Sequence, residues 1–240
     1  MSDKDKQLSE TKPDKAPVHS ARSEIDAFLN KVRSVPSPHV SGGRGRLIFA
    51  MDATMSRQPT WDHALHIQAE MFDETAQIGG LDVQLIYFRG FDECRASKWA
   101  GDARELGRFM TKVHCQGGHT QIGRVLKHVK KEARKTKVDA VVYVGDCMEE
   151  KVDSLCDAAG QLGLLGTPMF MFQEGQDHTA ETAFREISRL TGGAYCRFDT
   201  GSAQQLRELL SAVAVYAAGG RKALADRSSA KAQLLLEQLK

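Results

Sequence analysis

The stretch Leu47-Ile48-Phe49-Ala50-Met51-Asp52-Ala53-Thr54-Met55-Ser56 decides the fold of this chain. Its first five residues are apolar and follow a glycine-rich segment, a pattern typical of a strand buried on both faces of a parallel sheet. The strand ends at a carboxylate, Asp52, and hydroxyls follow at Thr54 and Ser56. A tight turn can bring these three side chains to one point, where a hard divalent cation finds the oxygen ligands it prefers. The alternative is a polar turn in which Thr54 or Ser56 caps the next helix.

The rest of the chain alternates between strand and helix patterns. Short apolar runs predict strands at residues 47–51, 83–88, 138–144, 167–173 and 194–198, and a turn at Gly90 and Asp92 predicts a further strand at 93–99. Apolar residues at helical spacing predict helices at 24–32, 61–78, 103–114, 120–136, 149–165, 179–191, 202–218 and 226–240. This order predicts an α/β fold, a doubly wound, mostly parallel, Rossmann-like sheet with helices on both faces. The segment 93–99 is expected to return as one antiparallel edge strand.

Composition divides the chain into four parts. Residues 1–20 are polar, charged and proline-containing, which predicts a disordered tail. Residues 21–45 combine a short helix with a linker rich in proline and glycine. The α/β domain is expected at 46–218, and a C-terminal helical tail at 219–240.

The overall composition and charge of the chain argue against several classes of protein. A hydrophobic content of 41% over 240 residues supports a substantial core. The formal net charge of +2 gives no argument for a nucleic-acid or membrane partner. Five cysteines are scattered without a CxxC pair, which is typical of free thiols in a reducing compartment. With neither a signal peptide nor a run of about 20 apolar residues, the sequence predicts a cytoplasmic protein.

A second carboxylate, Asp146, directly follows the apolar run 138–144. The carboxyl ends of parallel strands share one edge of a sheet, so Asp52 and Asp146 are expected to lie together. Thr120 stands in a glycine-containing loop before a helix, and right-handed connections bring that loop to the same edge. The predicted metal ligands are therefore Asp52, Thr54, Ser56, Thr120 and Asp146. Two carboxylates and three hydroxyls, without His or Cys, favour Mg²⁺ or Mn²⁺ over zinc or copper.

This pattern resembles the von Willebrand factor A (VWA) domain and its metal-ion-dependent adhesion site (MIDAS). The family motif is Asp-x-Ser-x-Ser, then a Thr in a later loop, then an Asp after a following strand. Here it stands as Asp52-Ala53-Thr54-Met55-Ser56, Thr120 and Asp146. The resemblance covers residues 46–218. Thr54 replaces the first motif serine and Gly145-Asp146-Cys147 replaces the common Thr-Asp-Gly, but every oxygen ligand is kept.

The resemblance implies a protein-binding module rather than an enzyme. In the family the two motif hydroxyls bind Mg²⁺ or Mn²⁺ directly, and the Thr and the two Asp bind it directly or through water. An Asp or Glu of a partner protein completes the shell. VWA domains of cytoplasmic bacterial proteins are often adaptors for larger machines, among them AAA+ ATPases, so a partner of that kind is expected. By adjacency, Arg57 and Glu149 are expected to border the site.

The helix expected at 120–136 carries a strongly basic face. Its cations are Arg124, Lys127, Lys130, Lys131, Arg134 and Lys135, and Lys137 follows. A basic helix face can hold phosphate groups, but no aromatic residues for base stacking are interleaved with these cations. We interpret the face as solvated, and expect neither nucleic acid nor a membrane as the partner.

An enzyme is the alternative interpretation. Phosphatases of the haloacid dehalogenase type also place a nucleophilic Asp after the first strand of an α/β sheet, where Asp52 stands. They carry a Gly-Asp after a later strand, as Gly145-Asp146 would supply here. Their general acid is an Asp two positions after the nucleophile, and Thr54 occupies that position. Without this acid, protonation of the leaving group has no evident agent.

We therefore expect the protein to turn over a generic phosphate monoester no faster than the background reaction, because a threonine cannot replace the missing general acid. A colorimetric assay with para-nitrophenyl phosphate and Mg²⁺ measures the rate. Turnover that disappears in the Asp52→Asn variant would establish the phosphatase interpretation instead.

Overall fold

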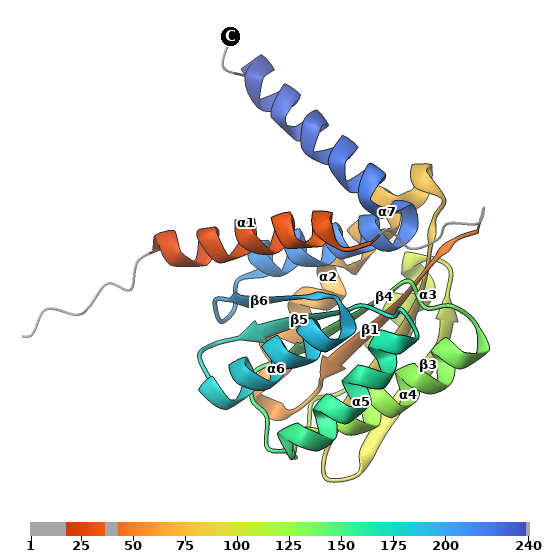
Figure 1. Cartoon of the computed structure of the whole chain (residues 1–240), viewed down its shortest axis with the longest axis vertical. Helices are drawn as coiled ribbons and strands as arrows, with labels where there is room; N and C mark the ends of the chain where they lie inside the picture. Colours follow the sequence, from red (N-terminus) through yellow and green to blue (C-terminus); the bar gives the residue numbers. More distant parts are fainter. Residues whose placement is uncertain (1–17, 37–42, 239–240) are drawn as a thin grey trace, which may run out of the picture.

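The computed structural model describes residues 18–36 and 43–238, with side chains from 22 to 36 and from 43 to 226. In this part of the chain six strands form one sheet in the order β3-β2-β1-β4-β5-β6 (Figure 1). They are β1 (Gly45–Asp52), β2 (Leu81–Arg89), β3 (Glu93–Ala100), β4 (Ala140–Gly145), β5 (Met169–Glu174) and β6 (Ala194–Phe198). Every neighbouring pair is parallel except β2 and β3, which confirms the predicted sheet with its antiparallel edge strand.

Helices cover both faces of the sheet (Figure 1). One face carries α1 (Val18–Ser34), α2 (Gln58–Thr75), α3 (Ala103–Met110) and α7 (Ala203–Gln238). The other carries α4 (Ile122–Lys135), α5 (Val152–Leu164) and α6 (His178–Thr191). The short 3₁₀ helices η1 (Met55–Arg57) and η2 (Ala76–Ile78) stand at the two ends of α2. Within the described ranges, no helix has both the length and the apolar character needed to cross a membrane.

Helix α1 is longer than the sequence predicts and packs into the core of the domain. Phe28 is buried, and its ring meets those of Phe170 and Phe172 on β5 edge to face, with centroids 6.2 and 5.3 Å apart. The helix begins inside the predicted tail, because its apolar stripe finds a partner surface only in the folded domain. Residues 1–17 of that tail and 37–42 of the predicted linker lie outside the described part of the chain.

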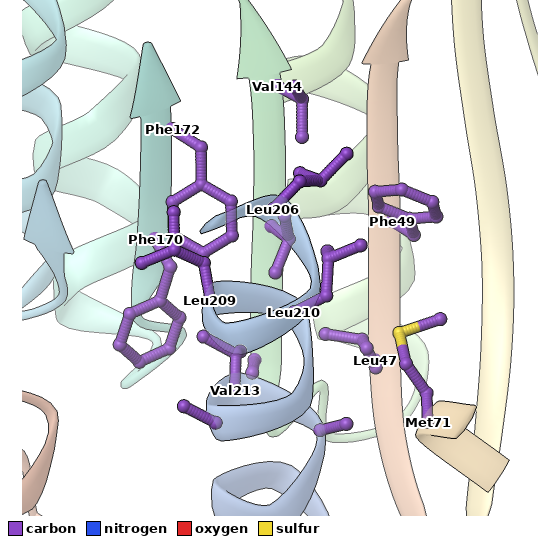
Figure 2. Packing of buried hydrophobic residues seen from close by; sticks show 14 of the residues in the cluster. Leu47, Phe49, Met71, Val144, Phe170, Phe172, Leu206, Leu209, Leu210 and Val213 are labelled. Carbon is purple, nitrogen blue, oxygen red and sulfur yellow. The ribbon is translucent and has the colours of Figure 1, made fainter. Parts of the chain in front are cut away.

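Helix α7 packs lengthwise across the middle of the sheet. Figure 2 shows buried aliphatic side chains of the helix against buried side chains of three strands: Leu206, Leu209, Leu210 and Val213 against Phe49, Val144, Phe170 and Phe172. The helix kinks at Gly220, whose φ of 66° lies in the left-handed region that glycine tolerates. The two helices predicted at 202–218 and 226–240 are therefore one helix with a kink at Gly220, beyond which α7 leads away from the sheet (Figure 1).

We expect Leu209→Ala to lower the free energy of unfolding by about 2–5 kcal/mol, because it leaves a cavity between α7 and the sheet. Leu209 is 0% exposed, whereas Leu164 at the end of α5 is 90% exposed and offers the same substitution as a matched control. Leu164→Ala should change the free energy by no more than about 0.5 kcal/mol. Urea unfolding followed by circular dichroism measures both, and equal losses would contradict this packing.

Candidate metal site at the carboxyl edge of the sheet

The register of the sheet brings the ends of β1 and β4 level with each other. Met51 pairs with Val144, so Asp52 lies level with Gly145 and Asp146 comes one residue later. The ligand atoms of Asp52, Asp146 and the neighbouring Cys147 all lie within 4.8 Å of one another. This edge of a parallel α/β sheet is where ligands commonly bind.

Hydrogen bonds organise the loop after β1. The N–H of Thr54 donates to Asp52 Oδ1 at 2.7 Å, and the hydroxyl of Ser56 donates to Asp146 Oδ2 at 3.0 Å. The hydroxyl oxygens of Thr54 and Ser56 are 3.4 Å apart. Thr54 precedes η1, yet its side chain makes no capping hydrogen bond within the described residues. Four of the five predicted ligands thus form one connected group.

Thr120 reaches the same edge on the loop before α4. Its N–H and its hydroxyl donate to Glu149 Oε2 at 2.9 and 3.1 Å, and the N–H of Glu149 donates back to that hydroxyl at 3.2 Å. Gly118 allows the loop to approach, because a Cβ at this position would lie 2.1 Å from the backbone of Gly90. Thr120 is thereby tied to the loop that carries Asp146, and its hydroxyl oxygen has one lone pair left for a ligand.

Two carboxylate oxygens at the site are buried without hydrogen bonds. Among the described residues, neither Asp52 Oδ2 nor Asp146 Oδ1 has a partner. Burial raises the pKa of Asp52 to about 7; Asp146 adds to this effect, while the hydrogen bonds from Thr54 and the charge of Arg57 oppose it. Orphaned carboxylate oxygens beside hydroxyls match the donor set that Mg²⁺ or Mn²⁺ prefers, so these residues fit such an ion.

A buried guanidinium shares this environment. Arg57 is 5% exposed, and its Nε lies 3.2 Å from Asp146 Oδ2, an ion pair that lacks the alignment of a hydrogen bond. Arg57 also pairs with Glu174, which is buried at the end of β5. Glu174 accepts further hydrogen bonds from the hydroxyl of Thr60 and, at 3.0 Å, from the N–H of Gly201. Arg57 therefore partly neutralises Asp146.

Adjacency in the sequence correctly placed Arg57 and Glu149 beside the predicted ligands, but Glu174 was missed. A signal for Glu174 existed, because it ends an apolar strand in the same way as Asp52 and Asp146 do. The rule that groups carboxylates at strand ends would have found it.

Cys147 adds a sulfur beside oxygen ligands that the sequence had grouped without one. Burial and the neighbouring carboxylates, Asp146 first among them, raise the pKa of the Cys147 thiol and keep it neutral. A neutral thiol is a poor metal ligand, but a softer ion such as zinc can deprotonate it.

The sequence matches no protein-family model and no curated protein. A von Willebrand factor type A structure from Catenulispora acidiphila is similar in fold, with a TM-score of 0.57 at 14% identity over 72% of this chain and 43% of that one. The SpRpn10 VWA domain has a TM-score of 0.54 to this chain at 10% identity, and the match covers 70% of this chain and 94% of that domain. A variant of the PilB minor pilin from Streptococcus sanguinis has a TM-score of 0.55 at 10% identity, and the match covers 74% of this chain and 62% of that one.

This chain thus spans less than half of the first of these structures and less than two thirds of the third. Likeness at such low identity concerns the fold, and it confirms the VWA fold that the sequence pattern predicts.

In protein stripped of metal with EDTA, we expect Asp52→Asn to be more stable than the wild type at pH 8. The pKa of Asp52 is about 7 in the folded protein, whereas an unfolded chain has about 3.9. The contribution of the neutral Asp52 carboxyl to the free energy of unfolding is therefore fully present below about pH 4. It is lost as the pH rises through the pKa that this carboxyl has in the folded protein. The introduced amide side chain would keep the hydrogen bond from Thr54 and carry no charge to bury.

At pH 8 the free energy of unfolding of the Asp52→Asn variant should exceed that of the wild type by on the order of 1–4 kcal/mol, and this difference should shrink toward pH 5. Guanidinium chloride unfolding at the two pH values measures the difference between variant and wild type. A difference that does not change with pH would contradict a raised pKa at this position.

Proposed function

We propose that this chain, which has the fold of a VWA domain, is a protein-binding module that holds Mg²⁺ or Mn²⁺ at the carboxyl edge of its sheet. Asp52, Thr54, Ser56, Thr120 and Asp146 hold the cation, and an Asp or Glu of a partner protein completes its ligands. The observation that carries the proposal is the pair of buried oxygens without partners, Asp52 Oδ2 and Asp146 Oδ1. A divalent cation supplies the Lewis acidity that binds an external carboxylate in place of water.

The charges at this edge make an acidic partner dependent on the cation. Asp146 and Glu149 contribute negative charge, and Asp52 adds to it where its carboxyl is ionised. The guanidinium of Arg57 is already shared between Asp146 and Glu174. An incoming carboxylate is therefore repelled in the absence of metal, and with metal it gains a charge-assisted bond. Metal binding and partner binding should consequently be coupled.

Exposed apolar side chains on the neighbouring loops can supply the contact area that one such bond lacks. Met55, which is 64% exposed, lies between two predicted ligands, and Phe91, which is 74% exposed, lies in the β2–β3 turn. The Phe91 ring meets that of His119, next to Thr120, with centroids 5.2 Å apart. Burial of these side chains contributes affinity, while the cation selects for an acidic residue. A subunit of a larger assembly, such as an AAA+ ATPase, is a partner of the proposed kind.

Calorimetric titration of the purified chain tests the metal site. We expect Mg²⁺ or Mn²⁺ to bind the wild type and Cys147→Ser equally well, because the thiol is not one of the proposed ligands. Asp52→Ala should weaken binding by about tenfold or more, since it removes a charged ligand in a buried site. Zinc binding that is lost in Cys147→Ser, without any response to Mg²⁺ or Mn²⁺, would contradict the proposed site.

The same variants extend this test to the protein partner. A protein captured on the immobilised chain should be released by EDTA, should return with Mg²⁺ or Mn²⁺, and should bind Cys147→Ser but not Asp52→Ala. Capture that survives both EDTA and Asp52→Ala would show that the partner docks on another surface.

A further inference from the structure

A basic groove lies between helix α4 and the edge strand β3, and none of the predicted metal ligands lines it. Its volume is about 620 Å³, and the strands contribute Ile86, Cys94, Arg95 and Ala96 to its lining. Seven of its eleven lining residues are Lys or Arg, and none is Asp or Glu. A lining with one sign of charge over an apolar base favours an anionic occupant that also has an apolar side.

Four of these seven cations form no ion pair within the part of the chain that the structure describes: Lys127, Lys130, Lys131 and Arg134. The other three are paired, Arg95 with Glu93, Arg124 with Asp92 and Lys135 with Glu132. Lys130 donates a hydrogen bond to Gln161, whereas Lys127, Lys131 and Arg134 make neither kind of contact within the described residues. Positions 127, 131 and 134 are four and three residues apart, so they share one face of α4 and form a row about 10 Å long. We call these three residues the cation row.

The strand beside this row has an unpaired edge. Within the described ranges β3 pairs only with β2, so every second N–H and C=O along its other edge faces outward. Such an edge is a template for an added strand. Alternate side chains of an added strand recur about every 6.8 Å on one side, a spacing close to the roughly 5–6 Å between members of the cation row.

We propose that this groove binds an extended acidic segment of a partner protein, which adds to β3 as a further strand and places alternate carboxylates against the cation row. Main-chain hydrogen bonds to β3 supply affinity, and the cations supply selectivity for Asp or Glu. The interaction needs no metal ion and is independent of the function proposed for the carboxyl edge.

The groove is less suited to nucleic acid. None of its lining residues is Phe, Tyr or Trp, so unstacked bases would find no aromatic platform. The formal net charge of the chain is only +2, which gives little long-range attraction for a polyanion. The open strand edge, in contrast, matches the hydrogen-bonding pattern of a polypeptide and not that of a phosphate backbone.

Fluorescence anisotropy with the full chain in EDTA tests this proposal. The probe is a labelled peptide of four Glu-Val repeats, which should bind, whereas the matching Lys-Val peptide should not. Lys127→Glu/Lys131→Glu should weaken binding of the acidic peptide by about tenfold or more, because two attractions become repulsions. Lys31→Glu/Lys112→Glu is the matched control, since it changes the net charge equally at exposed sites outside the groove and should leave the affinity within about twofold. Asp52→Ala should bind the peptide as the wild type does.

Backbone methylation tests the added strand. Methylating the nitrogens of either all the Glu or all the Val residues removes the donors that face β3 in one of the two peptides, so one of them should bind at least about tenfold more weakly. Unchanged binding of both methylated peptides would overturn the strand addition. Equal weakening by the two double variants, or binding of single- or double-stranded DNA in preference to the peptide, would overturn the proposal as a whole.

Discussion

The candidate site depends on the way in which two neighbouring parallel strands end. Strands β1 and β4 run in register, and each delivers a carboxylate to the same edge. Asp52 is buried there, and burial disfavours its charged form. The charged form is stabilised by the hydrogen bond from Thr54 and by the charge of Arg57, which pairs with Asp146. The cation proposed above would stabilise it further, and without a cation a proton neutralises part of the population.

The apolar layers on the two faces of the sheet stabilise the fold enough to offset the cost of burying the Asp52 carboxylate. A pKa raised from 3.8 to about 7 corresponds to roughly 4 kcal/mol against the charged form of Asp52. A fully buried Leu or Phe contributes about 1.5–3 kcal/mol, so two or three of the side chains that α1 and α7 bury against β5 offset this cost. An apolar core of this size therefore lets the protein keep a functional group that destabilises it when no ligand is bound.

Helix α4 connects two surfaces of opposite charge. Its first turn is held by Glu150, which accepts the N–H groups of Ile122 and Gly123 beside the candidate metal site. The next residue, Arg124, donates a hydrogen bond to Asp92 of the β2–β3 hairpin and also lines the basic groove. The proposed site at the carboxyl edge would need a metal cation to bind an acidic residue, whereas the groove presents its own cations. Helix α4 thus borders both of the surfaces proposed to bind a partner, and the two proposals rest on different physical interactions.

The sequence by itself determined the order of the strands and helices along the chain, the irregularity of the last helix at Gly220 and the carboxylates at the ends of β1 and β4. These features follow from local signals, namely the period of the apolar residues and the positions of glycine and aspartate. Only the tertiary structure decided that Arg57 pairs with Glu174, 117 residues away, that the Cys147 sulfur joins the carboxylates, and that α1 packs into the core. It also decided that α4 packs beside the edge strand β3. Such contacts depend on which elements become neighbours in space, and no local periodicity encodes that choice.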